Sequence, residues 1–149
     1  MVDYAKADRT IRKTKQIGDT PIQEYHKLSC HCGAVEIELH LPEGVVDPRR
    51  CSCSICSSRG AVTGTVTLDQ LRIVKGEEFL SLYQFNTRIA KHYFCKVCGI
   101  YTHHQRRSFP DQYGYNVARL EGVNVYELGE VPLLDGINHP CDRKADATT

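Results

Sequence analysis

The sequence predicts a mainly β fold of several short antiparallel sheets, with little helix and with bound metal joining its parts. Apolar and polar residues alternate over short segments that glycine and proline separate, and seven of the eight cysteines fall into three tight clusters. No long segment has the periodicity of a helix. Short strands between frequent turns bury little surface by themselves, so we expect this fold to depend on its metal.

The clearest strands are two segments in which side chains alternate in character. Apolar and polar residues alternate over residues 34–40, and valines alternate with threonines over residues 61–67. Single helical turns are expected at residues 68–71 and directly after Cys53. Shorter strands are expected over residues 72–74, 79–85, 91–94, 101–103 and 113–117.

Length and composition indicate one domain with an ordinary core. The chain has 149 residues, of which 41% are hydrophobic and 25% charged, as in soluble globular proteins. The net charge of +1 argues against bulk electrostatic binding to nucleic acid or membranes, and no apolar run is long enough to span a bilayer. The first residues are polar and unlike a signal peptide, so we expect a cytoplasmic protein with reduced cysteines.

The two ends of the chain differ from its middle. Residues 1–20 carry several cations and few apolar residues, which predicts a solvated arm. Acidic residues dilute these cations, so nucleic-acid binding is not expected. Residues 142–149 have the composition of a frayed tail. A single folded domain over residues 21–141 remains.

Two of the cysteine clusters share a glycine directly after the second cysteine. They are Cys-His-Cys-Gly at residues 30–33 and Cys-Lys-Val-Cys-Gly at residues 95–99. Thiolates so close together chelate a metal readily, whereas a disulfide between them is strained. Glycine permits the sharp turn of a chelating loop. The four thiolates pair naturally as a closed, structural zinc site, with ligands Cys30, Cys32, Cys95 and Cys98.

The middle cluster has the spacing Cys-x-Cys-x-x-Cys and supplies Cys51, Cys53 and Cys56 from one loop. Three protein ligands and one free position are typical of a reactive zinc, and the free position accepts water or a substrate thiol. The alternative is a closed site without zinc chemistry. Cys141, the eighth cysteine, or His139 would close it, and spacing alone does not separate the two possibilities.

Several cationic and aromatic side chains are weaker candidates for the same site. Arginines close to the middle cluster would offset thiolate charge and hold an anionic ligand; they are Arg49, Arg50 and Arg59. Three histidines flank the last cluster and either reach a pocket or are simply half-buried; they are His92, His103 and His104. Arg106 and Arg107 either clamp a carboxylate or form an ordinary solvated turn, which the sequence favours slightly.

Five motifs in order resemble the family of glutathione-dependent formaldehyde-activating enzymes and centromere protein V. They lie within residues 25–140, at 29–35, 51–56, 83–87, 94–99 and 135–140. The resemblance implies an Mss4-like fold over the domain at residues 21–141. It also implies a structural zinc on the four paired cysteines and a second zinc, associated with glutathione, on the middle cluster. Cys141 is not part of the family pattern, which favours an open second site.

The resemblance implies a carbon–sulfur lyase that joins glutathione and formaldehyde into S-hydroxymethylglutathione, or that uses a related thiol and a small aldehyde. The expected catalytic residues are Cys51, Cys53 and Cys56, which hold a labile second zinc, and His139. Either His139 or a bound water protonates the carbonyl oxygen. Arg59 is the expected glutathione contact. The alternative is a non-catalytic zinc-binding interaction module of the centromere protein V type. The oligomeric state stays open.

Overall fold

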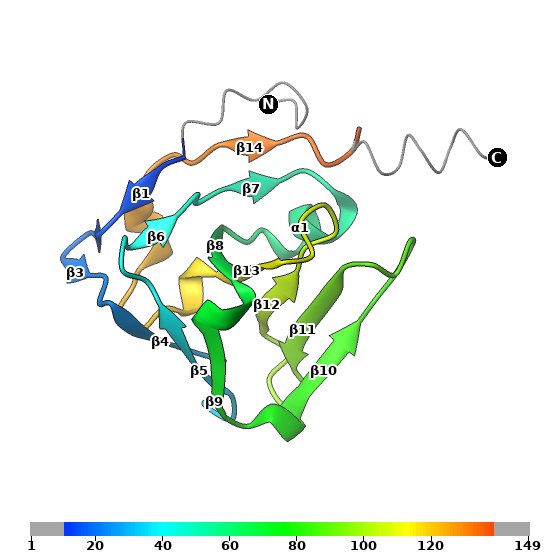
Figure 1. Cartoon of the computed structure of the whole chain (residues 1–149), viewed down its shortest axis with the longest axis horizontal. Helices are drawn as coiled ribbons and strands as arrows, with labels where there is room; N and C mark the ends of the chain where they lie inside the picture. The colour runs from blue at the N-terminus through cyan, green and yellow to red at the C-terminus, as the bar shows by residue number, and fades with distance from the viewer. Residues whose placement is uncertain (1–10, 139–149) are drawn as a thin grey trace.

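The structure is a computed structural model, and it describes residues 11–138 (Figure 1). Its largest element is a five-stranded antiparallel sheet with strand order β10-β11-β12-β13-β8. Four of these strands follow one another along the chain, and β8 pairs with β13 at the far edge. The bounds are β8 (Thr63–Thr67), β10 (Leu80–Tyr83), β11 (Lys91–Cys95), β12 (Tyr101–Gln105) and β13 (Gln112–Asn116).

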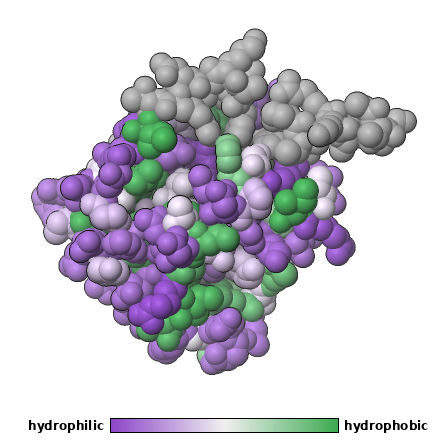
Figure 2. All heavy atoms as spheres, viewed as in Figure 1, coloured by the Kyte–Doolittle hydropathy of each residue, from purple (hydrophilic) through white to green (hydrophobic). Residues whose placement is uncertain are grey.

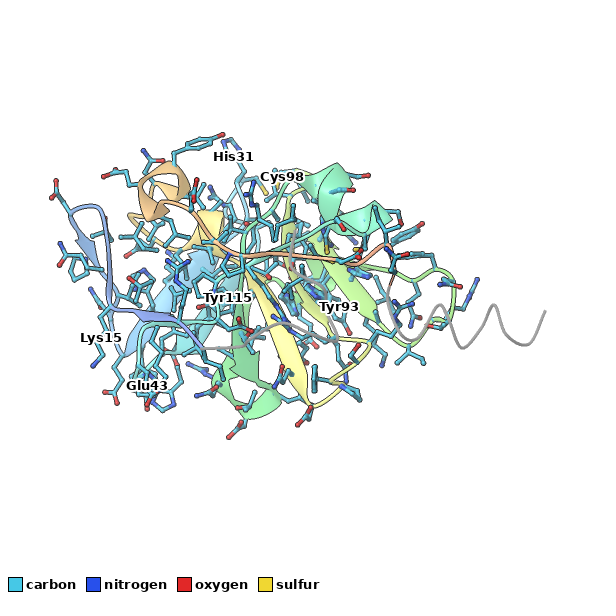
Figure 3. The ribbon with its side chains drawn as sticks, turned by 90° about the horizontal axis from the view of Figure 1, so that it is seen from above. Lys15, His31, Glu43, Tyr93, Cys98 and Tyr115 are labelled. Carbon is cyan, nitrogen blue, oxygen red and sulfur yellow. The ribbon has the colours of Figure 1, made fainter. Side chains whose placement is uncertain are left out.

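A second, three-stranded sheet has the order β4-β5-β9 and is also antiparallel. Its strands are β4 (Tyr25–Ser29), β5 (Glu36–His40) and β9 (Leu71–Lys75). Side chains from both sheets meet in one core, for example Ile37 and Leu39 of β5 with Val66 of β8 and Tyr115 of β13. Tyr115 lies in the interior (Figure 3), and its side chain is fully buried. The strands predicted in these regions are confirmed, with ends shifted by up to a few residues.

The segment before β4 belongs to the folded body, which corrects part of the predicted solvated arm. β1 (Lys13–Thr14) pairs with β6 (Val45–Val46), and β2 (Gln16–Ile17) pairs with β3 (Thr20–Pro21). The side chain of Ile17 is only 2% exposed and lies in the core. The prediction was therefore wrong for residues 11–20, because one buried isoleucine and short strand pairings fix them. Residues 1–10 and the expected tail at 142–149 lie outside the described residues.

Two segments that are distant in the sequence, one before and one after the strands of the large sheet, pair with each other. β7 (Arg50–Cys51) runs parallel to β14 (Leu133–Leu134), and the helix α1 (Ser54–Arg59) follows β7 directly (Figure 1). The remaining helical segments are single 3-10 turns: η1 (Leu68–Gln70), η2 (Glu77–Phe79), η3 (Val117–Arg119) and η4 (Val125–Leu128). The expected helical turns after Cys53 and at residues 68–71 are thus confirmed.

The surface seen in Figure 2 is mostly hydrophilic, with apolar side chains gathered in several separate patches. Within the described residues, no helix is both long enough and apolar enough to cross a bilayer. The fold is therefore mainly β, built from several small sheets with one short α-helix, as the sequence predicts.

Candidate active site

The first cysteine group joins the two sheets. Cys30 follows the last residue of β4, and Cys95 is the last residue of β11. Each strand runs into a tight turn that presents a second cysteine, Cys32 or Cys98. The glycines after these cysteines have φ angles of +80° and +78°, in the left-handed region that glycine adopts without strain. The turn geometry expected from the Cys-Gly pairs is present in both halves.

The four sulfur atoms of this group have the spacing of a tetrahedral zinc site. All lie within 4.8 Å of one another, with 3.6 Å between the Sγ atoms of Cys30 and Cys32 and 3.7 Å between those of Cys32 and Cys95. Zn–S bonds of about 2.3 Å place tetrahedral ligands roughly 3.8 Å apart. Backbone N–H groups of Val35 and Val97 donate to two of the sulfurs. The donor set fits a closed four-thiolate centre at one edge of the molecule, where Figure 3 labels Cys98.

The second cysteine group sits on one short loop. Cys51 ends β7, Cys53 caps the N-terminus of α1, and Cys56 lies in the first turn of that helix. The backbone N–H of Cys56 donates to the sulfur of Cys53 over 3.5 Å. The three Sγ atoms lie within 4.8 Å of one another and all three residues are half-buried. This donor set fits a metal ion with three protein ligands. The described residues supply no fourth ligand, so one coordination position is left open.

Charge is concentrated at this second group. Hydrogen bonds from the thiols of Cys51 and Cys56 hold the pKa of Cys53 far below its ordinary value. The same interaction with Cys53 raises the pKa of Cys51. The Arg59 guanidinium donates to the sulfur of Cys56 over 3.6 Å. Cys53 therefore carries the thiolate character of the group, and a metal ligand set of all three would require the other two thiols to lose their protons as well.

The segment after β14 covers one side of the second group. The backbone N–H of Gly136 donates to the hydroxyl of Ser52 over 3.1 Å. A Cβ atom at Gly136 would collide with the sulfur of Cys51 and would lie 2.6 Å from the Cβ of Cys53. Only a glycine lets the backbone come this close to the thiols. The sequence predicts a turn at this glycine but gives no sign of its contact with the cysteines.

A cavity of about 300 Å³ opens beside the three-cysteine group. The loop after β10 forms one wall with Phe85, and the strands β11 and β12 contribute His92 and His104. The rings of Phe85, His92 and His104 stack in sequence, with centroids 5.8 Å and 5.2 Å apart. The other polar lining residues include Arg49, Thr63, Asn86, Thr87, Arg106, Arg107 and Ser108.

Both histidines on the wall are neutral at physiological pH. Burial, helped by the charge of Arg59, lowers the pKa of His92 to about 4. Burial also holds the pKa of His104 well below its ordinary value, with the charge of Arg59 next in importance. The Nη1 atom of Arg59 lies 3.2 Å from Nδ1 of His92. Since a guanidinium only donates, Nδ1 accepts and the proton of His92 is on Nε2.

Arg59 itself lies behind the three-cysteine group. Its guanidinium stacks over the ring of Tyr101, 3.8 Å from the centroid. It lines a neighbouring cavity of about 450 Å³, between α1 and the large sheet, and not the cavity beside the thiols. From the side of this neighbouring cavity, Arg59 therefore stabilises negative charge on the sulfur of Cys56 and fixes the tautomer of His92.

Residues 25–127 match the family model of glutathione-dependent formaldehyde-activating enzymes. The chain belongs to this family. The match spans the four-cysteine group and the three-cysteine group, and it confirms the family that the five motifs indicate.

Individual relatives agree with the family match. Two fungal proteins named for this family, from Emericella nidulans and Penicillium rubens, are 32% and 30% identical over 79 residues. The chain spans about two-fifths of their length, and the alignments cover 50% of this chain and 40% and 41% of theirs. The fold is similar to a crystal structure of a Rhodobacter sphaeroides protein, with a TM-score of 0.69 and 64% identity. That similarity covers 72% of this chain and 98% of the other.

The predicted site residues of this family member fall into three sets. Both cysteine groups come together as predicted, and His92 and His104 reach the cavity. His103, buried in β12, does not line it. His139 and Cys141 lie outside the described residues, so the proton donor and the closure of the site stay predictions.

The arginine pair after β12 differs from the expected solvated turn. Arg106 is only 6% exposed and its Nη2 atom donates to the hydroxyl of Thr65 over 2.8 Å. Both Arg106 and Arg107 line the cavity. The favoured interpretation was wrong for Arg106, because β8 and β13 bring Thr65 beside it, a contact that no local pattern predicts.

Proposed function

We propose that the protein is a zinc-dependent carbon–sulfur lyase-like enzyme that acts on a thiol adduct of a small aldehyde. The family reaction joins glutathione and formaldehyde into S-hydroxymethylglutathione, and a related thiol is the alternative substrate. One observation carries the proposal: the three-cysteine group borders a cavity, whereas the four-cysteine group is tied into the junction of two sheets. A non-catalytic zinc module of the centromere protein V type does not require that difference.

Each cysteine group holds one zinc ion in this proposal. Cys30, Cys32, Cys95 and Cys98 bind the structural ion, and Cys51, Cys53 and Cys56 bind the second, more labile ion. Zinc bound with an open position lowers the pKa of a thiol ligand enough to ionise it near neutral pH. Thiolates also need a reducing compartment, which supports a cytoplasmic location.

The residues of the cavity supply orientation and hydrogen bonding. The substrate sulfur forms a bond to the carbonyl carbon, and the C=O electron pair moves onto oxygen. His92, neutral and protonated on Nε2, donates a hydrogen bond to that oxygen. The oxygen takes up one proton and the thiol releases one, so the step balances. His139 remains the proposed acid that delivers the proton.

The test is exchange between free formaldehyde and its glutathione adduct, followed by NMR magnetisation transfer on the zinc-loaded protein. Cys53→Ser removes a proposed ligand of the second zinc, and we expect it to abolish the catalysed exchange while the fold persists. Ser58→Ala, on the exposed face of α1, is the matched control and keeps the wild-type rate. The uncatalysed rate is measured without protein and subtracted. A folded Cys53→Ser protein with wild-type exchange contradicts the proposal and leaves the interaction module.

A further inference from the structure

The wall of the cavity carries a buried cation with unused hydrogen-bonding capacity. Arg106 is 6% exposed, and Nη2 donates to the hydroxyl of Thr65. Its Nε atom is buried and has no hydrogen-bond partner among the described residues. A buried guanidinium N–H without a partner costs free energy, so such a group marks a place where a ligand completes the bonding.

The charges around Arg106 favour an anion. Arg49 and Arg107 also line the cavity, and Arg49 is 5% exposed with an Asp47 carboxylate 3.5 Å from its Nη1. No aspartate or glutamate occurs among the described residues that line the cavity. His92 and His104 add no charge near neutral pH. The described wall of the cavity therefore carries guanidinium groups and no carboxylate, and Asp47 offsets part of the charge at Arg49.

The shape of the charge selects the kind of anion. A guanidinium presents N–H donors in a planar fork that matches a carboxylate through two parallel hydrogen bonds. The cavity volume of about 300 Å³ lies at the small end of the range for ligand sites. A ligand whose sulfur reaches the cysteine group and whose carboxylate reaches Arg106 must therefore be compact.

We propose that Arg106, supported by Arg49, is a carboxylate-binding residue of this cavity, and that the preferred ligand is a compact thiol bearing a carboxylate. The inference rests on the proposed function, because the thiol is placed at the three-cysteine group. It goes further by naming the charge and size of the substrate and the residue that selects them.

Binding of four probes tests the inference without relying on turnover. Calorimetry on the zinc-loaded full chain compares 3-mercaptopropionate with its methyl ester, which lacks the negative charge and carries one added methyl group. The same pair with a methylated sulfur, 3-(methylthio)propionate and its ester, measures the anion site without a thiol. We expect the acid of each pair to bind at least about tenfold more tightly, since hydrogen bonds to charged groups exceed neutral ones by roughly that factor.

Substitution of the arginine assigns the preference to its side chain. Arg106→Gln is expected to abolish the preference for the acid while binding of the ester is kept, and Arg106→Lys retains part of it because the charge remains without the fork. Arg50→Gln is the matched control, since Arg50 neighbours the same site but is exposed and does not line the cavity. Should Arg106→Gln fail to fold, Arg49→Gln and the wild-type comparison of acid and ester still decide the question.

Three results overturn the inference: equal binding of acid and ester by the wild-type protein, an unchanged preference in Arg106→Gln, or a preference lost equally in Arg50→Gln. Glutathione binding more tightly than 3-mercaptopropionate overturns the size requirement. A preference for the acid without any catalysed exchange of formaldehyde, with either glutathione or 3-mercaptopropionate as the thiol, supports the anion site and removes the proposed function, so the two failures are distinct.

Discussion

The two cysteine groups offer the same ligand chemistry in different surroundings, and the proposed function assigns them different roles for that reason. In the first group, Cys30 directly follows a strand of one sheet and Cys95 ends a strand of the other; both are buried, whereas Cys32 is exposed and Cys98 half-buried. In the second group, all three ligands are half-buried and lie within one loop. Metal at the first group closes a loop of more than sixty residues, as the separation of 63 between Cys32 and Cys95 shows. Metal at the second group closes only its own short loop.

This contrast indicates how the fold separates stability from reactivity. In the proposed function, four thiolates on two sheets leave no ligand position of the metal open, and this metal holds the domain together. A ligand set on one loop can lose its metal without releasing any strand from its sheet. The four predictions below test that separation.

The largest effect is expected from Cys95→Ser. Structural zinc contributes on the order of 10 kcal/mol to folding, which is comparable to the whole stability of a domain. We expect the variant to be unfolded, which circular dichroism measures. We also expect it to bind no stoichiometric zinc, which native mass spectrometry measures. A Cys95→Ser protein that stays folded with two metal ions would show that the fold does not depend on metal at the first group.

Cys53→Ser is expected to lose one metal ion and keep the fold. Because α1 and β7 contribute little to the core, its unfolding free energy should fall by no more than about 2 kcal/mol. In the wild-type protein, a mild chelator should remove one ion well before unfolding, which native mass spectrometry counts directly. Release of both ions only on unfolding would remove the contrast between the two groups.

Acid is expected to lower the free energy of unfolding of the domain through protonation of the buried side chain of His103. Burial lowers the pKa of His103 to about 4, below the ordinary value of 6.5 for the unfolded chain. Its contribution is therefore complete above the unfolded pKa and is lost as pH falls toward the folded one. From about pH 7 to about pH 5 the loss is about 2 kcal/mol.

His103→Gln isolates this contribution, because it removes the titration and leaves the metal ligands of both groups in place. The difference in unfolding free energy between wild type and variant should shrink by that amount over the same pH range, measured by urea denaturation. A difference independent of pH contradicts the assignment to His103.

The smallest effect, and the most local, is expected from Gly136→Ala. The added methyl group collides with Cys51 and Cys53, so the second metal should bind at least about tenfold more weakly while the first is unaffected. Gly129→Ala is the control: its φ of +80° makes the substitution strained, yet nothing lies within 4 Å of the added atom. Competition with a chromophoric chelator measures the affinity for the second metal in each variant. Equal losses of affinity in Gly136→Ala and Gly129→Ala would show that the collision is not the cause.

The sequence predicts what depends on local spacing. Alternation identifies β5 because Val35, Ile37 and Leu39 share one buried face, and the cysteine groups follow from the reach of a metal ion. Two-residue strands such as β1 and β2 carry no such pattern, and only burial of Ile17 in a core assembled elsewhere fixes them.

The walls of the candidate active site are hard to predict for the same reason. His92, His104 and Arg106 lie on different strands or beyond their ends, and the register of the large sheet brings them to one cavity. Arg106 lies in a segment with the composition of an exposed turn. Its burial depends on Thr65, which is 41 residues away in the sequence. Gly136 contacts the cysteines only because β14 pairs with β7.

The pairing of β14 with β7 has a consequence for the order of events on the ribosome. The ligands of the first group are all synthesised once Cys98 has been added, so that centre can form while the last part of the chain is still being translated. The segment that covers the second group, with Leu134 and Gly136, is made later. With metal bound as proposed, a chain interrupted between these points would hold the metal of the first group and leave the three thiols of the second group uncovered, open to oxidation or to a foreign metal.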